Sequence, residues 1–154
     1  MTEIQHAQFP QDLEAVIAIF REYIASASVS LAFQDYEAEF ATLPGKYALP
    51  EGRLLLAWQD GKVVGCVALR QVHAQTCEMK RVYVRPEARG EDLGRRLVQR
   101  ILDEARVAGY SRMCLDVLPE FTAAQRIYKS LGFTTAAPIT FNPVPGTNFL
   151  GLDL

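Results

Sequence analysis

The stretch CEMKRVYVRPEARGEDLGRRL, residues 77–97, decides the fold because it joins a strand to the start of a helix. Residues 77–84 are rich in β-branched and aromatic side chains, and Pro86 stops a central strand because it cannot donate to the ladder. From Leu93 onward, apolar residues recur with a helical period until Gly109. The stretch therefore predicts a strand that ends near Arg85 and a helix that begins near Leu93.

The connection between these two elements, residues 89–94, is typical of an anion site. Gly90 and Gly94 let the backbone approach a ligand closely, and the N–H groups of a first helical turn have no partners inside the helix. A phosphate or pyrophosphate binds well at such a terminus. The alternative is a plain surface turn in which Asp92 caps the helix, and the glycine pair alone does not exclude it.

Two motifs in this sequence resemble those of the GNAT superfamily of N-acetyltransferases. The acetyl-CoA motif of that family begins with Arg or Gln and ends with Gly or Ala, and its ends match Arg89 and Gly94, while Asp92 replaces the middle glycine. The segment TAAQRIYKSLGF, residues 122–133, resembles the second helix motif of the family. Its matching residues are Ala124, Tyr128, Leu131, Gly132 and Phe133, and Phe121 stands where the family often has Asn.

The resemblance implies that acetyl-CoA is the cosubstrate. In that family two neighbouring strands splay apart, and the pantetheine arm of the cofactor pairs with the strand before the pyrophosphate loop. Unpaired N–H and C=O groups on such a strand edge would hydrogen-bond the amides of the ligand. The cofactor-binding residues implied here are Val82, Tyr83, Val84, Arg89, Gly90, Glu91, Asp92, Leu93, Gly94 and Arg95.

The composition argues against several classes of protein. The 154 residues carry 16 Lys and Arg against 18 Asp and Glu, and this net charge of −2 argues against a general nucleic-acid binder. No apolar run approaches the roughly 20 residues that span a bilayer, and the first residues lack the features of a signal peptide. We therefore expect a cytoplasmic protein without membrane contacts. The cysteines Cys66, Cys77 and Cys114 are widely spaced in apolar runs, which favours buried thiols over a metal site.

The whole sequence, residues 1–154, predicts a single domain of the α+β class. Two amphipathic helical segments near the N-terminus have apolar faces at 13–24 and 31–40. Strand-like runs at 53–58 and 62–70 flank an Asp-Gly turn, and a strand, a helix and a closing strand follow the central helix. This order is that of the GNAT fold, a mixed, mostly antiparallel twisted sheet of about six to seven strands flanked by about four helices.

Two side chains are candidates for catalysis. An alkyl amine is mostly protonated at neutral pH, so a general base is useful, and the family commonly places an acidic residue at the position of Glu78. The alternatives are that Glu78 only pairs with Lys80 or Arg81, or that Asp116 on the next strand is the base. Tyr128 matches the family's general acid, whose phenol protonates the departing thiolate, although helical periodicity alone is typical of a core tyrosine.

The expected acceptor is a small-molecule amine. In the resembling family the N-terminal helical pair borders the acceptor site, so we expect Phe33, Tyr36 and Tyr47 to bind the acceptor, although periodicity alone favours simple packing. The proline-rich segment 138–146 lies between the last two strands and is a candidate cover for the cleft. We expect no nucleic-acid or metal partner, and the sequence leaves room for a homodimer.

The leading hypothesis is thus an acetyl-CoA-dependent N-acetyltransferase that works by direct transfer in a ternary complex, without an acyl-enzyme. One alternative is a non-catalytic sensor of acyl-CoA, suggested by Asp92 and Phe121, which depart from the family motifs. The other is a protein-interaction domain with no nucleotide ligand. The intact Tyr128 position favours the enzyme.

Overall fold

The computed structural model describes residues 1–154 and contains a seven-stranded sheet with four α-helices. The strands are β1 (Thr2–His6), β2 (Arg53–Gln59), β3 (Lys62–His73), β4 (Thr76–Val84), β5 (Arg112–Val117), β6 (Thr134–Thr135) and β7 (Asn148–Asp153). The helices are α1 (Leu13–Ser26), α2 (Tyr36–Ala41), α3 (Leu93–Val107) and α4 (Thr122–Ser130), with 3-10 turns η1 (Ala32–Gln34), η2 (Gly45–Tyr47) and η3 (Pro86–Ala88). The predicted mixed α+β architecture is confirmed.

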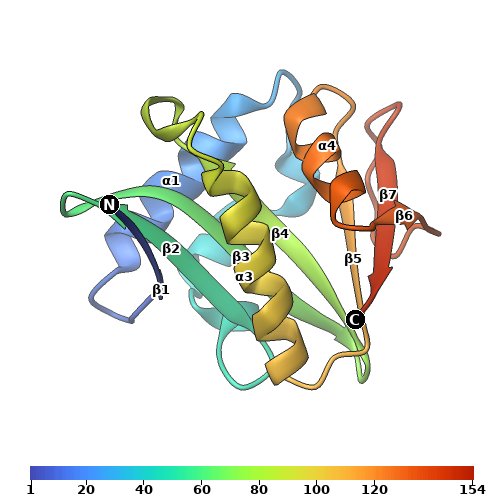
Figure 1. Cartoon of the computed structure of the whole chain (residues 1–154), viewed down its shortest axis with the longest axis horizontal. Coiled ribbons are helices and arrows are strands. Elements are labelled where there is room, and N and C mark those ends of the chain that lie inside the picture. Colours follow the sequence, from blue (N-terminus) through green and yellow to red (C-terminus); the bar gives the residue numbers. More distant parts are fainter.

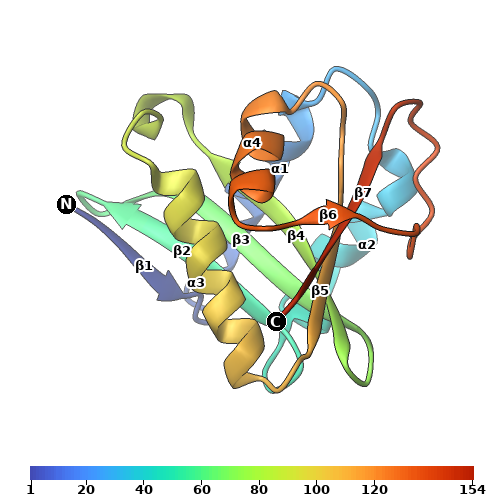
Figure 2. The same cartoon turned by 45° about the vertical axis from the view of Figure 1, so that its right-hand side comes forward.

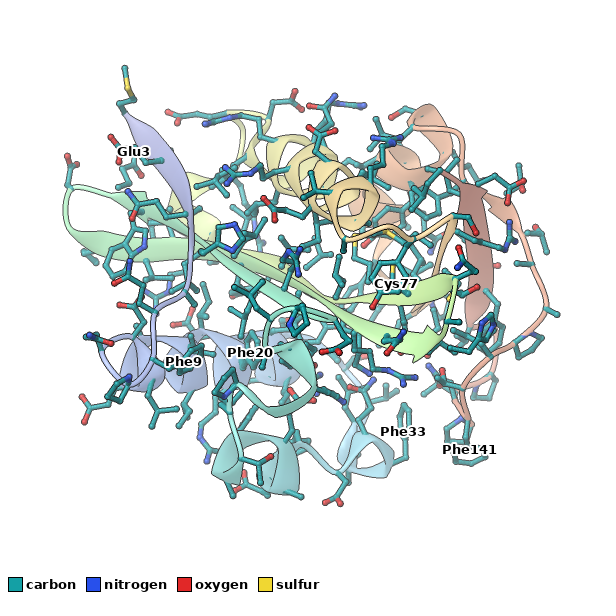
Figure 3. The ribbon with its side chains drawn as sticks, turned by 90° about the horizontal axis from the view of Figure 1, so that it is seen from below. Glu3, Phe9, Phe20, Phe33, Cys77 and Phe141 are labelled. Carbon is teal, nitrogen blue, oxygen red and sulfur yellow. The ribbon has the colours of Figure 1, made fainter.

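The sheet has the strand order β1-β2-β3-β4-β5-β7-β6, and every neighbouring pair is antiparallel except β4 with β5. Helices α3 and α4 cover one face of the sheet, and α1 lies on the opposite face (Figure 1). Seen from below, the sheet runs between α3 and α1 as the middle of three layers (Figure 3). Each face therefore has its own apolar core.

The predicted strand and helix on either side of residues 85–92 are confirmed, because β4 ends at Val84 and α3 begins at Leu93. The buried stripe of α3, which includes Leu97 and Ile101, packs against the sheet in the larger of the two apolar clusters. The smaller cluster lies under α1 and includes Phe20. Burying both faces of the central strands fixes the direction in which β4 presents its side chains and its backbone.

Strands β4 and β5 pair over a short length and then part. Their parallel pairing joins Thr76, Cys77 and Glu78 to the segment 112–114 and ends there. Beyond this point β5 continues to pair with β7, and β4 continues to pair with β3. Figure 2 shows α4 lying over the diverging ends of the two strands. The facing edges of β4 and β5 are consequently left without a strand partner.

A β-bulge interrupts the parted section of β4. Cys66 of β3 pairs with Tyr83, whereas Ala68, two residues later, pairs with Lys80, so β4 carries one extra residue. Arg81 lies in the bulge with a positive φ of 61°. The guanidinium of Arg81 lies 5.8 Å from the centre of the Phe20 ring of α1, so Lys80 and Arg81 both face the α1 side.

Two sequence expectations need correction. The second amphipathic segment is not one helix, because Asp35, with a φ of 51°, separates η1 from α2. The two-residue strand β6 was not expected at all, since so short an edge strand has no periodic signal.

The Asp-Gly hairpin and the three buried free cysteines are confirmed. None of the helices has the length and apolar character that a membrane crossing requires.

Candidate active site

A cavity of about 810 Å³ lies where β4 and β5 part. Its wall consists of β4 from Met79 to Val84, β5 from Leu115 to Val117, the start of α3 and one side of α4, and Tyr23 of α1 contributes to it as well. A volume of this size is typical of small-molecule sites. We call the part near Met79 and Leu115 the apex end and the part near Gly90 the mouth end. The side chains hold no cluster of His, Cys, Asp and Glu that could bind a metal ion.

The mouth end presents a row of free backbone N–H groups. No N–H from Gly90 to Arg95 donates a hydrogen bond within the protein, and the first paired one is Arg96, which donates to the Asp92 carbonyl at 3.1 Å. Gly90 and Asp92 have positive φ values of 95° and 61°. Successive N–H groups converge where left-handed and right-handed residues alternate, and such a concavity binds anions.

Two arginines line the same end and are held in place by the protein. The Arg89 Nε donates to the Val84 carbonyl at 3.0 Å, and the guanidinium lies 5.8 Å from the centre of the Tyr83 ring. Arg95 donates to the Ser130 hydroxyl at 2.6 Å. Of the residues expected to bind cofactor, only Glu91 lies outside the cavity wall, where it is exposed.

The expected side-chain cap by Asp92 is absent. Asp92 takes the left-handed conformation at the N-cap position, and its carboxylate accepts no hydrogen bond from the first turn of α3. The carboxylate is 67% exposed and lies 3.5 Å from the Arg95 Nε. Asp92 thus pairs with Arg95 instead of capping the helix, and the N–H groups of the first turn stay free of intramolecular partners.

The expected pantetheine partners, Val82, Tyr83 and Val84, form the β4 side of the cavity. In an antiparallel pair, alternate residues turn their N–H and C=O groups away from the partner strand. Since β5 pairs with β4 only as far as Glu78, such groups farther along β4 face the gap. The open edge can therefore hydrogen-bond an extended ligand that carries amides.

Tyr128 of α4 lines the cavity and is 5% exposed. Its ring packs at 5.7 Å from that of Phe133, and its hydroxyl makes no hydrogen bond in the protein. Every side-chain N or O atom that is fully buried in this protein has a hydrogen-bond partner. The Tyr128 hydroxyl has none, so it must border the open space of the cavity. Burial, together with the nearby Tyr23 and Asp116, raises the pKa of Tyr128 well above its ordinary value of about 10. The phenol therefore keeps its proton.

Two carboxylates flank the apex end. Glu78 is 1% exposed and lies behind the cavity wall, and its Oε1 accepts from the Arg70 Nε at 2.8 Å. The sequence suggested Lys80 or Arg81 as its ion-pair partner, and the structure places Arg70 there instead. Asp116 of β5 does line the cavity, and its Oδ2 accepts from the Asn142 amide at 3.0 Å.

None of the three expected acceptor-binding residues lines the cavity. The Phe33 ring packs edge-on against Phe141 at 6.2 Å, which connects η1 with the segment 138–146 (Figure 3). The Tyr36 ring lies 5.8 Å from that of Phe40. Tyr47 is 2% exposed in the α1-side cluster, and its hydroxyl donates to Glu39 at 3.0 Å.

Tyr23 and Lys80 are among the wall residues that sequence reasoning missed. Tyr23 was assigned to an apolar helix face, yet its ring lies 6.3 Å from that of Tyr83 and 6.2 Å from that of Phe121, and all three line the cavity. Burial raises the pKa of Tyr23 to about 12, although Arg81 opposes the shift. Lys80 was considered only as a partner for Glu78. No periodic pattern marks these positions, because the gap between β4 and β5 exists only in the folded sheet.

Solved structures with acetyltransferase folds resemble the chain over its whole length. An acetyltransferase from Streptococcus agalactiae superposes with a TM-score of 0.80 at 22% identity, covering 99% of this chain and 98% of that one. YncA from Salmonella typhimurium, solved with its cofactor acetyl-CoA, superposes with a TM-score of 0.75 at 23% identity, covering 99% and 94%. At these identities the likeness establishes the class of fold.

Sequence comparison supplies the family. The profile of the acetyltransferase (GNAT) family matches residues 15–133. An uncharacterised N-acetyltransferase of Schizosaccharomyces pombe is 39% identical over 153 residues, which is 98% of this chain and 94% of the relative. The chain therefore belongs to the GNAT family and is an N-acetyltransferase, which confirms the resemblance of its two motifs.

Proposed function

We propose that the protein transfers an acetyl group from acetyl-CoA to the amine of a small acceptor by direct attack in a ternary complex. The observation that carries the proposal is the order of groups around one cavity: free N–H groups at 90–95, the Tyr128 hydroxyl, and the carboxylates of Asp116 and Glu78 at the apex. These groups meet the needs of an anionic cofactor, a departing thiolate and an amine that must lose a proton.

The cavity suits the parts of acetyl-CoA. Arg89, Arg95 and the N–H groups of 90–95 would hold the pyrophosphate, because charged donors and a helix start both favour phosphate oxygens. The open backbone of 82–84 would pair with the amide-bearing arm. The acetyl-CoA complex of YncA supports this choice of cofactor.

Tyr128 would act chiefly as a hydrogen-bond donor. Acetyl-CoA supplies an activated acyl carbon with a thiolate as its leaving group, and an ordinary thiol has a pKa of about 8.5. Because burial raises the pKa of Tyr128 above 10, full proton transfer from this phenol to a thiolate is uphill. A neutral phenol aimed at the sulfur still stabilises developing negative charge there without giving up its proton.

The proton of the amine requires an acceptor at the apex. Asp116 reaches the cavity directly, whereas Glu78 is behind the wall and would act through a water molecule. Glu78 remains the proposed base, with Asp116 as the alternative. Glu78→Gln and Asp116→Asn separate them, because loss of the base lowers turnover most at low pH, where more of the amine is protonated.

The test combines a binding measurement with an activity measurement. Calorimetry should detect CoA and acetyl-CoA, each ligand should raise the melting temperature by mass action, and a panel of amines should release the free thiol. Acetyl-CoA binding without thiol release from any amine would identify an acyl-CoA sensor instead. A protein that binds neither ligand at millimolar concentration would contradict the proposal outright.

A further inference from the structure

The apex end of the cavity holds one cation, Lys80, that has no ion-pair partner in the protein. The cations around it mostly have carboxylate partners: Arg70 lies 2.8 Å from Glu78, and Arg81 lies 3.1 Å from Glu39. Lys80 also lines the cavity, but its ammonium makes no ion pair and no hydrogen bond in the protein. Since every fully buried side-chain N and O atom has a hydrogen-bond partner, the unpaired ammonium of Lys80 must border the open space of the cavity.

The bulge in β4 explains why this cation is present. Pairing with Ala68 turns Lys80 toward the α1 side of the sheet, and the extra residue keeps Arg81 on that side too. Arg81 is satisfied by Glu39 and by the Gln34 amide oxygen, which accepts at 2.6 Å. The fold thus brings two neighbouring cations to one face and supplies a carboxylate to one of them.

The surroundings of Lys80 make an added anion favourable. Burial lowers the pKa of Lys80. The positive charges of Arg81 and Lys46 lower this pKa further, and the negative charges of Glu78 and Asp116 act in the opposite direction. A mostly desolvated ammonium without a partner is costly, and a carboxylate brought to it recovers part of that cost.

We propose that Lys80 binds a carboxylate of the acceptor, so that the acceptor is an amino acid or another small amine with an acid group. This inference rests on the proposed acetyl transfer. Asp116, on the other side of the gap, lines the same cavity and has only the neutral Asn142 amide as a partner. A zwitterion places its amine toward Asp116 and Glu78 and its carboxylate toward Lys80, whereas a polyamine meets Lys80 with the wrong sign.

The first experiment compares acceptors that differ only in the acid group. Thiol release is measured at saturating acetyl-CoA with L-leucine, L-leucinamide and 3-methylbutylamine, and with the same three forms of the other proteinogenic amino acids. The best acid should exceed its amide in kcat/KM by about tenfold or more, the range of a charge-assisted hydrogen bond. The amine of the amide loses its proton more easily, so basicity cannot produce this preference.

The second experiment asks whether Lys80 causes the preference. Lys80→Met should lower the ratio of acid to amide by about 10- to 100-fold, mainly through the acceptor KM, and Lys80→Arg should retain most of it. Lys46→Met is the matched control, because Lys46 pairs with Glu39 at 3.1 Å and lies outside the cavity wall. Calorimetry of CoA-loaded enzyme with N-acetyl-L-leucine and its amide gives a readout without turnover, and melting curves check the fold.

Three results would overturn the assignment of Lys80. The wild-type protein could use amides as well as acids, or Lys80→Met could keep the wild-type ratio; the transferase proposal would survive both. Peptide mass spectrometry could instead find an acetyl group on Lys80 after incubation with acetyl-CoA alone, which would make this lysine a nucleophile. If no amine is acetylated, the transferase proposal itself fails, and the calorimetric arm still decides whether Lys80 holds a carboxylate.

Discussion

The two ends of the cavity are lined by different parts of the chain. The mouth end presents free backbone N–H groups from Gly90 to Arg95, whereas the apex end presents the side chains of Lys80 and Asp116, with Glu78 buried behind its wall. A backbone N–H group is present whatever the side chain, so these groups remain free with Asp92 in place of a glycine. The apex changes its chemistry with each substitution. Under the proposed function, the cofactor would therefore be recognised mainly by backbone groups and the acceptor mainly by side chains.

The apex end should also be the fragile end, because its scaffold contains a buried ion pair. Arg81 and Glu39 have side chains 1% and 5% exposed and lie 3.1 Å apart. Glu39→Gln leaves the guanidinium without a counter-charge and should destabilise the fold by roughly 3 to 5 kcal/mol. Urea denaturation measures the loss. The exposed pair of Arg21 and Glu37 is the control, and Glu37→Gln should cost under about 1 kcal/mol.

The same pair predicts how stability responds to acid. Burial would raise the pKa of Glu39, but the hydrogen bonds and charge of Arg81, with help from Lys46, outweigh burial and lower it. A depressed pKa stabilises the fold above the unfolded value of about 4.3, and this contribution disappears as the pH falls through the lower folded value. Denaturation midpoints should therefore drop on acidification below about pH 5. A Glu39→Gln variant with an equally steep drop would exclude this pair as the cause.

Tyr128 lies along the wall shared by the two ends, so its removal should uncouple binding from chemistry. Tyr128→Phe should lower kcat by about 10²- to 10³-fold while the affinity for acetyl-CoA stays nearly constant, because only the departing thiolate loses a donor. Steady-state assays of thiol release measure kcat, and calorimetry measures the affinity for acetyl-CoA. Unchanged turnover would remove Tyr128 from the mechanism and leave it as a packing residue against Phe133.

The segment 138–146 should affect only the apex end. Asn142→Ala removes the amide that donates to Asp116 at 3.0 Å and should raise the acceptor KM by about threefold to tenfold. The acetyl-CoA KM should remain the same, since the segment does not contribute to the mouth. An effect confined to the acetyl-CoA KM would show that this division of the cavity is wrong.

The smallest effect is expected at Asp92, in the backbone-built end. Asp92→Gly should stabilise the fold by a few tenths to about 1 kcal/mol, because glycine adopts a φ of 61° without strain and no side-chain cap is lost. The affinity for CoA should change by less than about threefold, since the carboxylate is exposed and screened. A tenfold gain in affinity would mean that the carboxylate opposes the ligand, and an acyl-CoA sensor would then be the better description.

The sequence predicted the strand, the turn with free N–H groups and the central helix because local chemistry decides them. Pro86, the glycines and the apolar stripe of α3 determine the backbone conformation of residues that are close to them in the sequence. The acceptor end could not be predicted in this way. Tyr23 and Phe20 belong to the same apolar helical face, yet one lines the cavity and the other is fully buried, and only the parting of β4 and β5 separates them. Likewise, an aromatic residue such as Tyr47 is typical of binding sites, yet Tyr47 lies in the apolar core under α1.

Because the bulge at Arg81 adds one residue to β4, the length of this strand constrains how the gene can evolve. Val82 and Val84 pack on the α3 side, and Tyr83 packs on the α1 side. Deleting a single codon between Glu78 and Val82 would restore regular pairing with β3 and leave only one of the two cations on the α1 face. A substitution such as Asp92 for glycine changes one side chain, whereas such a deletion would rearrange several side chains of the apex end at once. Lineages that keep this chemistry should therefore differ in the residues of β4 far more readily than in their number.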